Sequence, residues 1–186
     1  MWVDRWERNL SEHAIHLRGD ATDAVAQSAL IRRAQRADAP AVQAFVRKLS
    51  PDTRRKRFFG PVVELSPEQL VRLTSERSKD DLNLLVLDAR RDVIGMAQCV
   101  GTGDAEAEFA LVVADQWQRQ GIGTALCEAI FQHARKSGLA RLGGFVLTDN
   151  RAMLGFAAKL GFSMFRDTDA TVTRIVMPLS DHRSLV

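Results

Sequence analysis

A strand, a glycine-containing turn and a helix follow one another between residues 105 and 137, and this unit constrains the fold more than any other stretch. Residues 105–114 are apolar on most of both faces, which is typical of a central strand. Residues 121–137 have the spacing of an amphipathic helix, and Gly138 follows in the left-handed capping position. A central strand that leads into such a helix predicts a strand–helix–strand crossover.

The rest of the chain alternates between strand and helix patterns. We expect further strands at residues 30–34, 82–87, 93–100, 142–147, 162–166 and 172–179, the second and third of these forming a hairpin. Helices are expected to begin at Asp38, Ser50, Ser66 and Asn150, which are all residue types that cap helix N-termini. This order predicts a mixed α/β fold in which helices flank a central mixed sheet.

The length of 186 residues suits one domain, which we place at residues 29–180, between an N-terminal helical extension over 1–28 and a tail over 181–186. Trp2, Trp6, Leu10 and Leu17 fall roughly on one helical stripe that ends at Gly19. This stripe is expected to pack on its own domain or to form a contact in a homodimer.

Composition excludes several classes of protein. No apolar run approaches the roughly 18 residues of a membrane span, and the first residues do not resemble a signal peptide. Two cysteines cannot form a disulfide framework, so the cytoplasm is the expected compartment. A net charge of +3 makes nucleic acid an unlikely partner, and His13 and His16 have no evident third metal ligand. We therefore expect no metal and no membrane partner.

The turn between the central strand and its helix reads Gln118-Arg119-Gln120-Gly121-Ile122-Gly123. Two glycines allow successive backbone N–H groups to point into one concavity, and the helix adds its own free N–H groups. Its first turn carries no Asp or Glu that would compete with an anion. The segment predicts a phosphate or pyrophosphate site, or else a simple tight turn. Leu126 at the third glycine position argues against a dinucleotide fingerprint, and no Gly-Lys pair of a P-loop is present.

This turn resembles the acyl-CoA pyrophosphate motif of the GNAT N-acetyltransferases, and the order of elements from Leu30 to Leu179 is similar to that fold. Further stretches resemble the acetyltransferase domain of bacterial Pat-type protein lysine acetyltransferases: residues 49–51, 57–61, 107–113, 117–118, 150–154 and 159–162. The resemblance implies acetyl-CoA as acyl donor and an accessible lysine of a protein as acceptor. Alternatives are a small-amine N-acetyltransferase and a non-catalytic acyl-CoA-binding regulatory module.

The resemblance also implies the residues that contact the donor. The pyrophosphate would lie against residues 118–124, namely Gln118, Arg119, Gln120, Gly121, Ile122, Gly123 and Thr124. The backbone of Leu111, Val112 and Val113 would hold the pantetheine and thioester, and Asn150 would combine helix capping with a donor contact. Many GNAT enzymes carry a tyrosine at the position of Ala157, where it acts as the acid that protonates the departing thiolate. This chain contains no tyrosine.

Glu108 is the candidate general base. A lysine amine titrates near ~10.4 and is protonated at neutral pH, so it must lose a proton before it attacks. A carboxylate that is partly buried can accept this proton directly or through a water. The resemblance places Glu108 at the catalytic position; spacing alone also allows a solvated residue. Glu106 lies about 7 Å earlier on the same face, and its charge is expected to make Glu108 a better proton acceptor.

Two other features allow alternative roles. Residues 54–57, Arg-Arg-Lys-Arg, form a basic cluster that we interpret as a solvated helix face, with an acidic protein surface, the 3′-phosphate of CoA or nucleic acid as alternative partners. Cys127 is expected in the core, and Cys99 is expected there as well unless it approaches the thioester.

Overall fold

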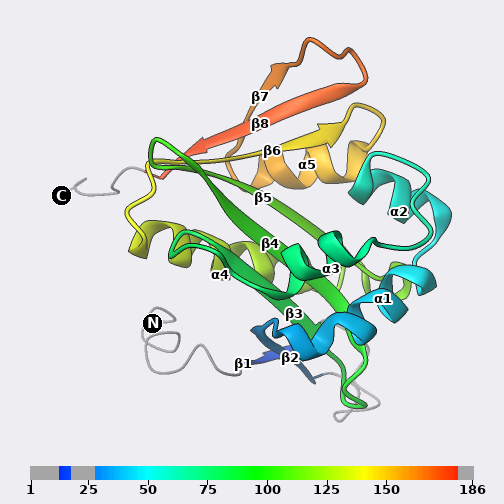
Figure 1. Ribbon diagram of the computed structural model, residues 1–186. Helices are drawn as coiled ribbons and strands as arrows, with labels where there is room; N and C mark the ends of the chain where they lie inside the picture. Colours follow the sequence, from blue (N-terminus) through cyan, green and yellow to red (C-terminus); the bar gives the residue numbers. More distant parts are fainter. Residues whose placement is uncertain (1–12, 18–27, 180–186) are drawn as a thin grey trace.

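The computed structural model describes residues 13–17 and 28–179, which fold around one eight-stranded sheet (Figure 1). Its strand order is β1-β2-β3-β4-β5-β6-β8-β7, and β5 and β6 are parallel while the other neighbours are antiparallel. The strands are β1 (His13–His16), β2 (Ser28–Arg33), β3 (Leu82–Leu87), β4 (Val93–Gly103), β5 (Glu106–Val113), β6 (Arg141–Leu147), β7 (Ser163–Arg166) and β8 (Val172–Pro178). The expected mixed sheet and its hairpin are confirmed.

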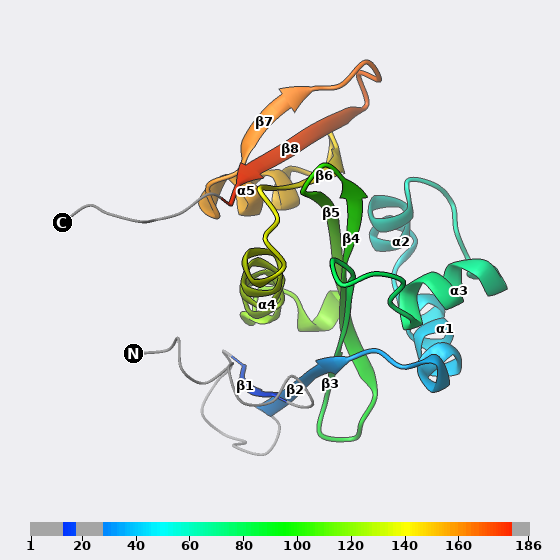
Figure 2. The same cartoon turned by 60° about the vertical axis from the view of Figure 1, so that its left-hand side comes forward.

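Helices cover both faces of the sheet, as the edge-on view in Figure 2 shows. One face carries α1 (Ala39–Lys48), α2 (Pro51–Phe58) and α3 (Pro67–Thr74); the other carries α4 (Ile122–Lys136) and α5 (Arg151–Lys159). Short 3-10 turns, η2 (Arg36–Asp38) and η3 (Asp115–Trp117), precede α1 and the glycine turn. Each face has its own buried core, and side chains of β3, β4 and β5 contribute to both.

The expected helix starts are confirmed with one difference. Ser50, Ser66 and Asn150 each accept a hydrogen bond from a backbone N–H in the first turn of their helix. Asp38 precedes α1 but makes no such bond. Its carboxylate instead accepts two hydrogen bonds of 2.7 Å from the Arg32 guanidinium. The Gln35 backbone N–H donates to the same carboxylate at 2.7 Å. Asp38 thereby ties β2 to the start of α1 through a bidentate, charge-assisted pair.

The prediction of an N-terminal helix over residues 1–28 is wrong for the part of that segment that the structure describes. His13–His16 form the edge strand β1, which pairs with β2, and the following Leu17 is buried in the core. The backbone of β2 offers hydrogen bonds along its edge, and this pairing outweighs the helical periodicity of the sequence. Trp2, Trp6, Leu10 and the tail 181–186 lie outside the described residues. No helix in the described ranges has the length and apolarity that a bilayer crossing requires.

The parallel junction between β5 and β6 is short. It contains the pairs Glu106–Arg141, Ala107–Leu142 and Glu108–Gly143, although both strands continue beyond them. Just past the last pair the two backbones still approach closely: a Cβ placed on Gly144 would lie 2.9 Å from the carbonyl oxygen of Phe109. Beyond this point the edge of β5 has no partner strand in β6.

Candidate active site

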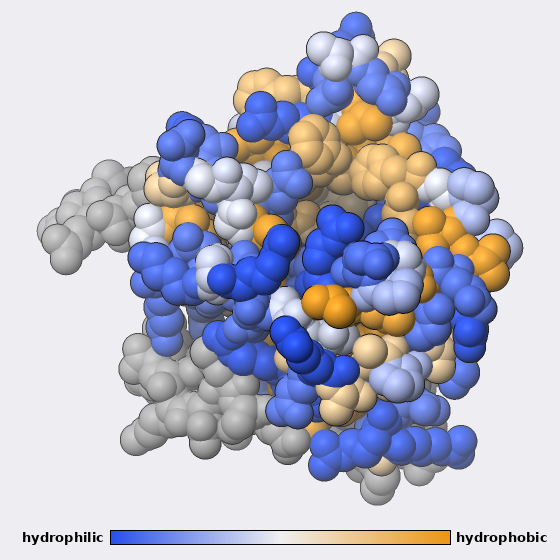
Figure 3. Space-filling view, viewed as in Figure 1, coloured by the Kyte–Doolittle hydropathy of each residue, from blue (hydrophilic) through white to orange (hydrophobic). Residues whose placement is uncertain are grey.

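A cleft of about 1590 Å³ runs past the unpaired part of β5. Its walls come from β5, β6, the turn before α4, and the helices α2 and α5. Figure 3 shows the molecule hollowed near the middle of the face that carries α1–α3, with strongly hydrophilic side chains beside the hollow. The cleft brings together most of the residues that the sequence predicts for the site: Glu108, Leu111, Val112, Val113, Gln118, Arg119, Gly121, Gly123, Thr124 and Asn150.

The glycine turn has the backbone geometry of an anion cradle. Arg119 and Gly121 are left-handed, with φ of 61° and 93°, and α4 begins directly after Gly121. No side chain caps the N-terminus of α4, and its first turn carries no acidic residue. Its N–H groups and the positive end of its dipole are therefore free to meet a negative ligand.

Two side chains of the turn do not reach the cleft, and a third ties the turn to β5. Ile122 is fully buried in the core, and the Gln120 amide donates to the carbonyl of Gln116, so neither side chain lines the cleft. The Gln118 amide donates to the carbonyl of Val113 at 3.1 Å and thereby ties the turn to the end of β5. A Cβ on Gly123 would lie 3.6 Å from the Phe156 ring, an ordinary contact distance, so this position has room for a methyl group.

Glu108 occupies the last pair of the junction and projects to the face that carries α1–α3. Its side chain is exposed, so the expected burial is not found. The expected influence of the Glu106 charge on Glu108 is not found either. That carboxylate accepts hydrogen bonds from Nε and Nη2 of Arg141, the first at 2.7 Å, so its charge is compensated by a neighbouring cation.

The segment before and within α2 forms a further wall of the site. Asp115 accepts hydrogen bonds from the backbone and side chain of Ser50 and from the hydroxyl of Thr53. Burial opposes ionisation of Asp115, but these bonds outweigh it and hold its pKa below the usual value. The start of α2 is thereby anchored to the turn after β5.

Arg57 does not belong to a solvated helix face as expected. Its Nε is buried and has no hydrogen-bond partner among the described residues, while its guanidinium lies 5.0 Å from the centre of the Phe58 ring. Burial lowers the pKa of this guanidinium to about 10. By contrast, Arg55 and Lys56 pair with carboxylates at the surface.

Residues 43–162 match the model of the Acetyltransferase (GNAT) family. The chain belongs to the GNAT acetyltransferase family. An acetyltransferase of Pseudomonas aeruginosa is 31% identical over 146 residues, which cover 75% of this chain and 77% of that protein.

Two further GNAT relatives are informative. The ribosomal protein bS18-alanine N-acetyltransferase of Escherichia coli is 34% identical over 80 residues, 43% of this chain and 51% of that enzyme. The crystal structure of the GNAT domain of S. lividans PAT has a TM-score of 0.80 and 27% identity, and covers 90% of this chain and 96% of that one. The fold expected from the sequence is therefore confirmed.

GNAT acetyltransferases use acetyl-CoA as acyl donor, and similar solved structures contain it. The residues of the cleft fit this group: the turn offers free N–H groups for a pyrophosphate, and the unpaired edge of β5 offers backbone groups for an extended amide chain. The Asn150 oxygen accepts from the Met153 N–H, which leaves its amide NH₂ as a possible donor.

Neither cysteine lies at the cleft. Cys99 and Cys127 are free and fully buried in the core, and burial raises the pKa of each thiol to about 12. Ala157 is also fully buried in the core. The position where many family members carry tyrosine therefore presents no acid here.

Sequence reasoning missed several residues that line the same cleft or depression as Glu108. Gln98 and Arg77 line the cleft, Arg174 lines a small adjoining depression, and Phe145 lines both. They come from β4, β6, β8 and the loop before β3, so only the sheet register brings them together. No local motif could have signalled them.

Proposed function

We propose that this GNAT enzyme acetylates lysine side chains of proteins by direct transfer from acetyl-CoA, with Glu108 as the general base. The observation that carries the proposal is the place of Glu108, at the last residue pair before β5 and β6 lose contact. A donor held along the unpaired edge of β5 would bring its acyl group close to this carboxylate. The acceptor would then approach from the face that carries α1–α3.

Each part of the site has a role in this reaction. The N–H groups of the glycine turn would bind the pyrophosphate, and the backbone of Leu111, Val112 and Val113 would orient the thioester. Glu108 would take a proton from the acceptor ammonium, directly or through a water, so that the neutral amine can attack. Acetyl-CoA would supply the acyl group, and CoA would leave as a thiolate. With no tyrosine at position 157, this thiolate would take a proton from solvent, another hydroxyl or the product ammonium.

The open shape of the acceptor side supports a protein acceptor. Glu108 is exposed, and large apolar side chains nearby are exposed as well, Phe145 to 42% and Phe165 to 53%. A surface of this kind suits a macromolecule better than an enclosed pocket would. One relative, the ribosomal protein bS18-alanine N-acetyltransferase, is named for a protein acceptor. The two free, buried cysteines suit a reducing compartment such as the cytoplasm.

Incubation of a cell lysate with the enzyme and acetyl-CoA tests the proposal. Mass spectrometry should detect new acetyl groups on lysine side chains, and these should be absent with Glu108→Gln. A panel of small amines, including spermidine and free amino acids, should be acetylated much more slowly. Rapid turnover of a small amine without new acetyl-lysine would favour the small-amine alternative.

A further inference from the structure

Cationic side chains gather on the acceptor face, by which we mean the sheet face that carries α1–α3 and Glu108. Arg57 of α2, Arg77 before β3 and Arg174 of β8 border the cleft or its adjoining depression. Within the described ranges, none of these arginines forms an ion pair. Of the three, Arg174 lines the same small depression as Glu108.

Carboxylates near these arginines are engaged elsewhere. Asp52 pairs within its own helix, Glu106 pairs across the junction, and Asp115 is held by hydroxyl and backbone groups. Glu108 has no hydrogen-bond partner in the described structure, but the base must remain free for the reaction. Asp81 also lines the cleft and is held by the backbone N–H groups of Arg77 and Gly101 and by the hydroxyl of Ser78. In the described ranges no carboxylate pairs with Arg174, and an acceptor could supply one.

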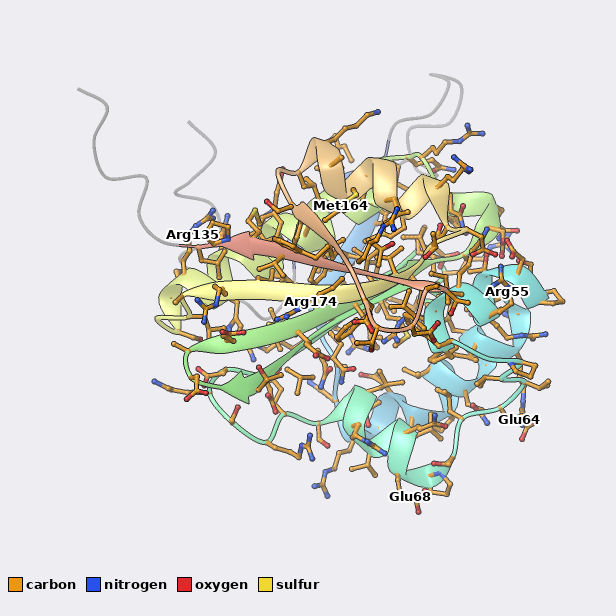
Figure 4. The ribbon with its side chains drawn as sticks, turned by 90° about the horizontal axis from the view of Figure 1, so that it is seen from above. Arg55, Glu64, Glu68, Arg135, Met164 and Arg174 are labelled. Atoms are coloured by element: carbon orange, nitrogen blue, oxygen red, sulfur yellow. The ribbon has the colours of Figure 1, made fainter. Side chains whose placement is uncertain are left out.

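Arg174 is the best placed of these cations. It stands directly opposite Phe145 of β6 and Phe165 of β7, so the three side chains form a row on one face across three strands. Glu108, Phe145 and Arg174 line one depression of about 110 Å³. In Figure 4, Arg174 and Met164 lie on opposite sides of the β7–β8 hairpin, and Met164 is the one on the side of α5.

The sheet register gives the separation between Arg174 and the proposed base. Glu108 pairs with Gly143, Gly143 pairs with Val176, and Arg174 is two residues along β8. Two strand spacings and two residues of strand rise place the Cα atoms of Glu108 and Arg174 roughly 12 Å apart. When the acceptor lysine lies at Glu108, a side chain a few residues away in the substrate sequence, or beside the lysine on a folded surface, can reach Arg174.

We infer that the acceptor lysine lies beside acidic residues of the substrate protein, which Arg174 binds between the rings of Phe145 and Phe165. The inference rests on the proposed function and specifies its substrate class. A carboxylate pairs with the guanidinium, while the methylene groups that carry it pack on the exposed rings. The positive charge of Arg174 also disfavours polyamines, which carry several ammonium groups.

Single-lysine peptides of equal length test this inference. Three peptides carry Glu, Gln or Arg at the positions two to four residues from the lysine, and thiol release from acetyl-CoA is measured at low salt. The Glu peptide should exceed the Gln peptide in kcat/KM by about 10-fold, mainly through KM, and the Arg peptide should be the poorest substrate. This preference should shrink in high salt.

Arg174→Gln should reduce the ratio between the Glu and Gln peptides to about threefold or less. Arg166→Gln is the matched control, because Arg166 is exposed on the same hairpin but pairs with Thr173 and therefore faces the other side. It should leave the ratio unchanged. The Kd for acetyl-CoA and the Tm of both variants should match the wild type, which shows that the fold is intact.

The outcomes distinguish failure of the acidic-substrate inference from failure of the proposed function. Equal kcat/KM for the three peptides would overturn the acidic-substrate inference while leaving lysine acetylation in place. An unchanged kcat/KM ratio between the Glu and Gln peptides in Arg174→Gln would exclude Arg174 as the residue that binds the acidic side chain. If no peptide is acetylated while spermidine or a free amino acid is, the proposed function itself fails.

Discussion

Glu108 and Gly143 form the last residue pair of the parallel ladder between β5 and β6. One position later, the Phe109 carbonyl lies so close to Gly144 that a side chain there would collide with it. The candidate base Glu108 therefore lies where the pairing of β5 and β6 ends. The glycine turn lies beyond the far end of β5, where β5 no longer pairs with β6. In the proposed reaction, a donor bound at the glycine turn and along β5 would have its acyl group near Glu108.

Replacement of the base gives the first prediction. Glu108→Gln keeps the size of the side chain but removes a proton acceptor, so kcat should fall by about 10²–10⁴-fold while the Kd for acetyl-CoA barely changes. Steady-state kinetics on a lysine substrate and calorimetry check the two parts.

Glu106→Gln serves as the control for this prediction. It breaks a partly exposed ion pair with Arg141, which is worth about 0–1 kcal/mol, and should cost little activity. If the two glutamine variants behave alike, Glu108 is not the base.

The anion cradle gives the second prediction. Gly123→Asp places a negative charge where we expect the pyrophosphate, and the Kd for acetyl-CoA should rise at least ~10-fold, about 1.4 kcal/mol. Gly123→Ala should bind nearly normally, since its methyl group meets the Phe156 ring at 3.6 Å. Calorimetry that finds the two variants equal to the wild type would contradict the assignment of the turn.

The close approach at the junction gives the third prediction. Gly144→Ala forces a methyl group to within 2.9 Å of the Phe109 carbonyl oxygen, and the backbone must shift. We expect a loss of about 1–3 kcal/mol in the free energy of unfolding, as for other overpacked positions. Gly155→Ala, in the exposed part of α5 with no atom near its Cβ, should be neutral or stabilising. Urea denaturation measures both, and similar values for the two variants would argue against a tight junction.

The pair of Arg32 and Asp38 gives the fourth prediction, which concerns pH. Hydrogen bonds from Arg32 are the main cause that holds the pKa of Asp38 below the usual value of an aspartate. The stability from this ionised carboxylate is therefore present above the unfolded pKa of about 3.9 and is lost as the pH falls through the lower folded pKa. Asp38→Asn should cost about 1.5–3 kcal/mol at pH 7. Its deficit relative to the wild type should shrink in urea titrations near pH 3.

The edge strand gives the fifth prediction. Deleting residues 1–26 removes β1 and leaves the edge of β2 unpaired, so the protein should lose stability or associate with itself while acetyl-CoA binding persists. Deleting residues 1–12 keeps β1 and should have a smaller effect. Size-exclusion chromatography and calorimetry follow the two properties. Loss of acetyl-CoA binding in a folded truncation would place the segment in the active site.

Local patterns predict much of this fold. Residues 82–87 are apolar except for Asn83 and form a strand buried on both faces. Ser66 stands three residues before Gln69 in a reciprocal cap. The glycine turn is equally local, because its backbone depends on residues a few positions apart. These features need no knowledge of the tertiary fold.

Other features depend on contacts between distant residues. His13–His16 lie in a segment with helical spacing, yet the edge of β2 makes them a strand. Asp38 does not cap α1, because its carboxylate binds Arg32 and the backbone N–H of Gln35 instead. The pairing of Glu106 with Arg141 and the row formed by Arg174 follow from strand register, which the sequence alone does not specify.

The short parallel junction also has a consequence for folding. Strands β3, β4 and β5 form a meander with short connections, whereas β6 reaches β5 only after the chain has crossed through α4. Contacts between residues close in sequence form faster than contacts that close long loops. The meander should therefore form early, and docking of the β6–β8 segment should complete the molecule late. Because that docking creates one wall of the cleft, the capacity to bind acetyl-CoA should appear last during refolding.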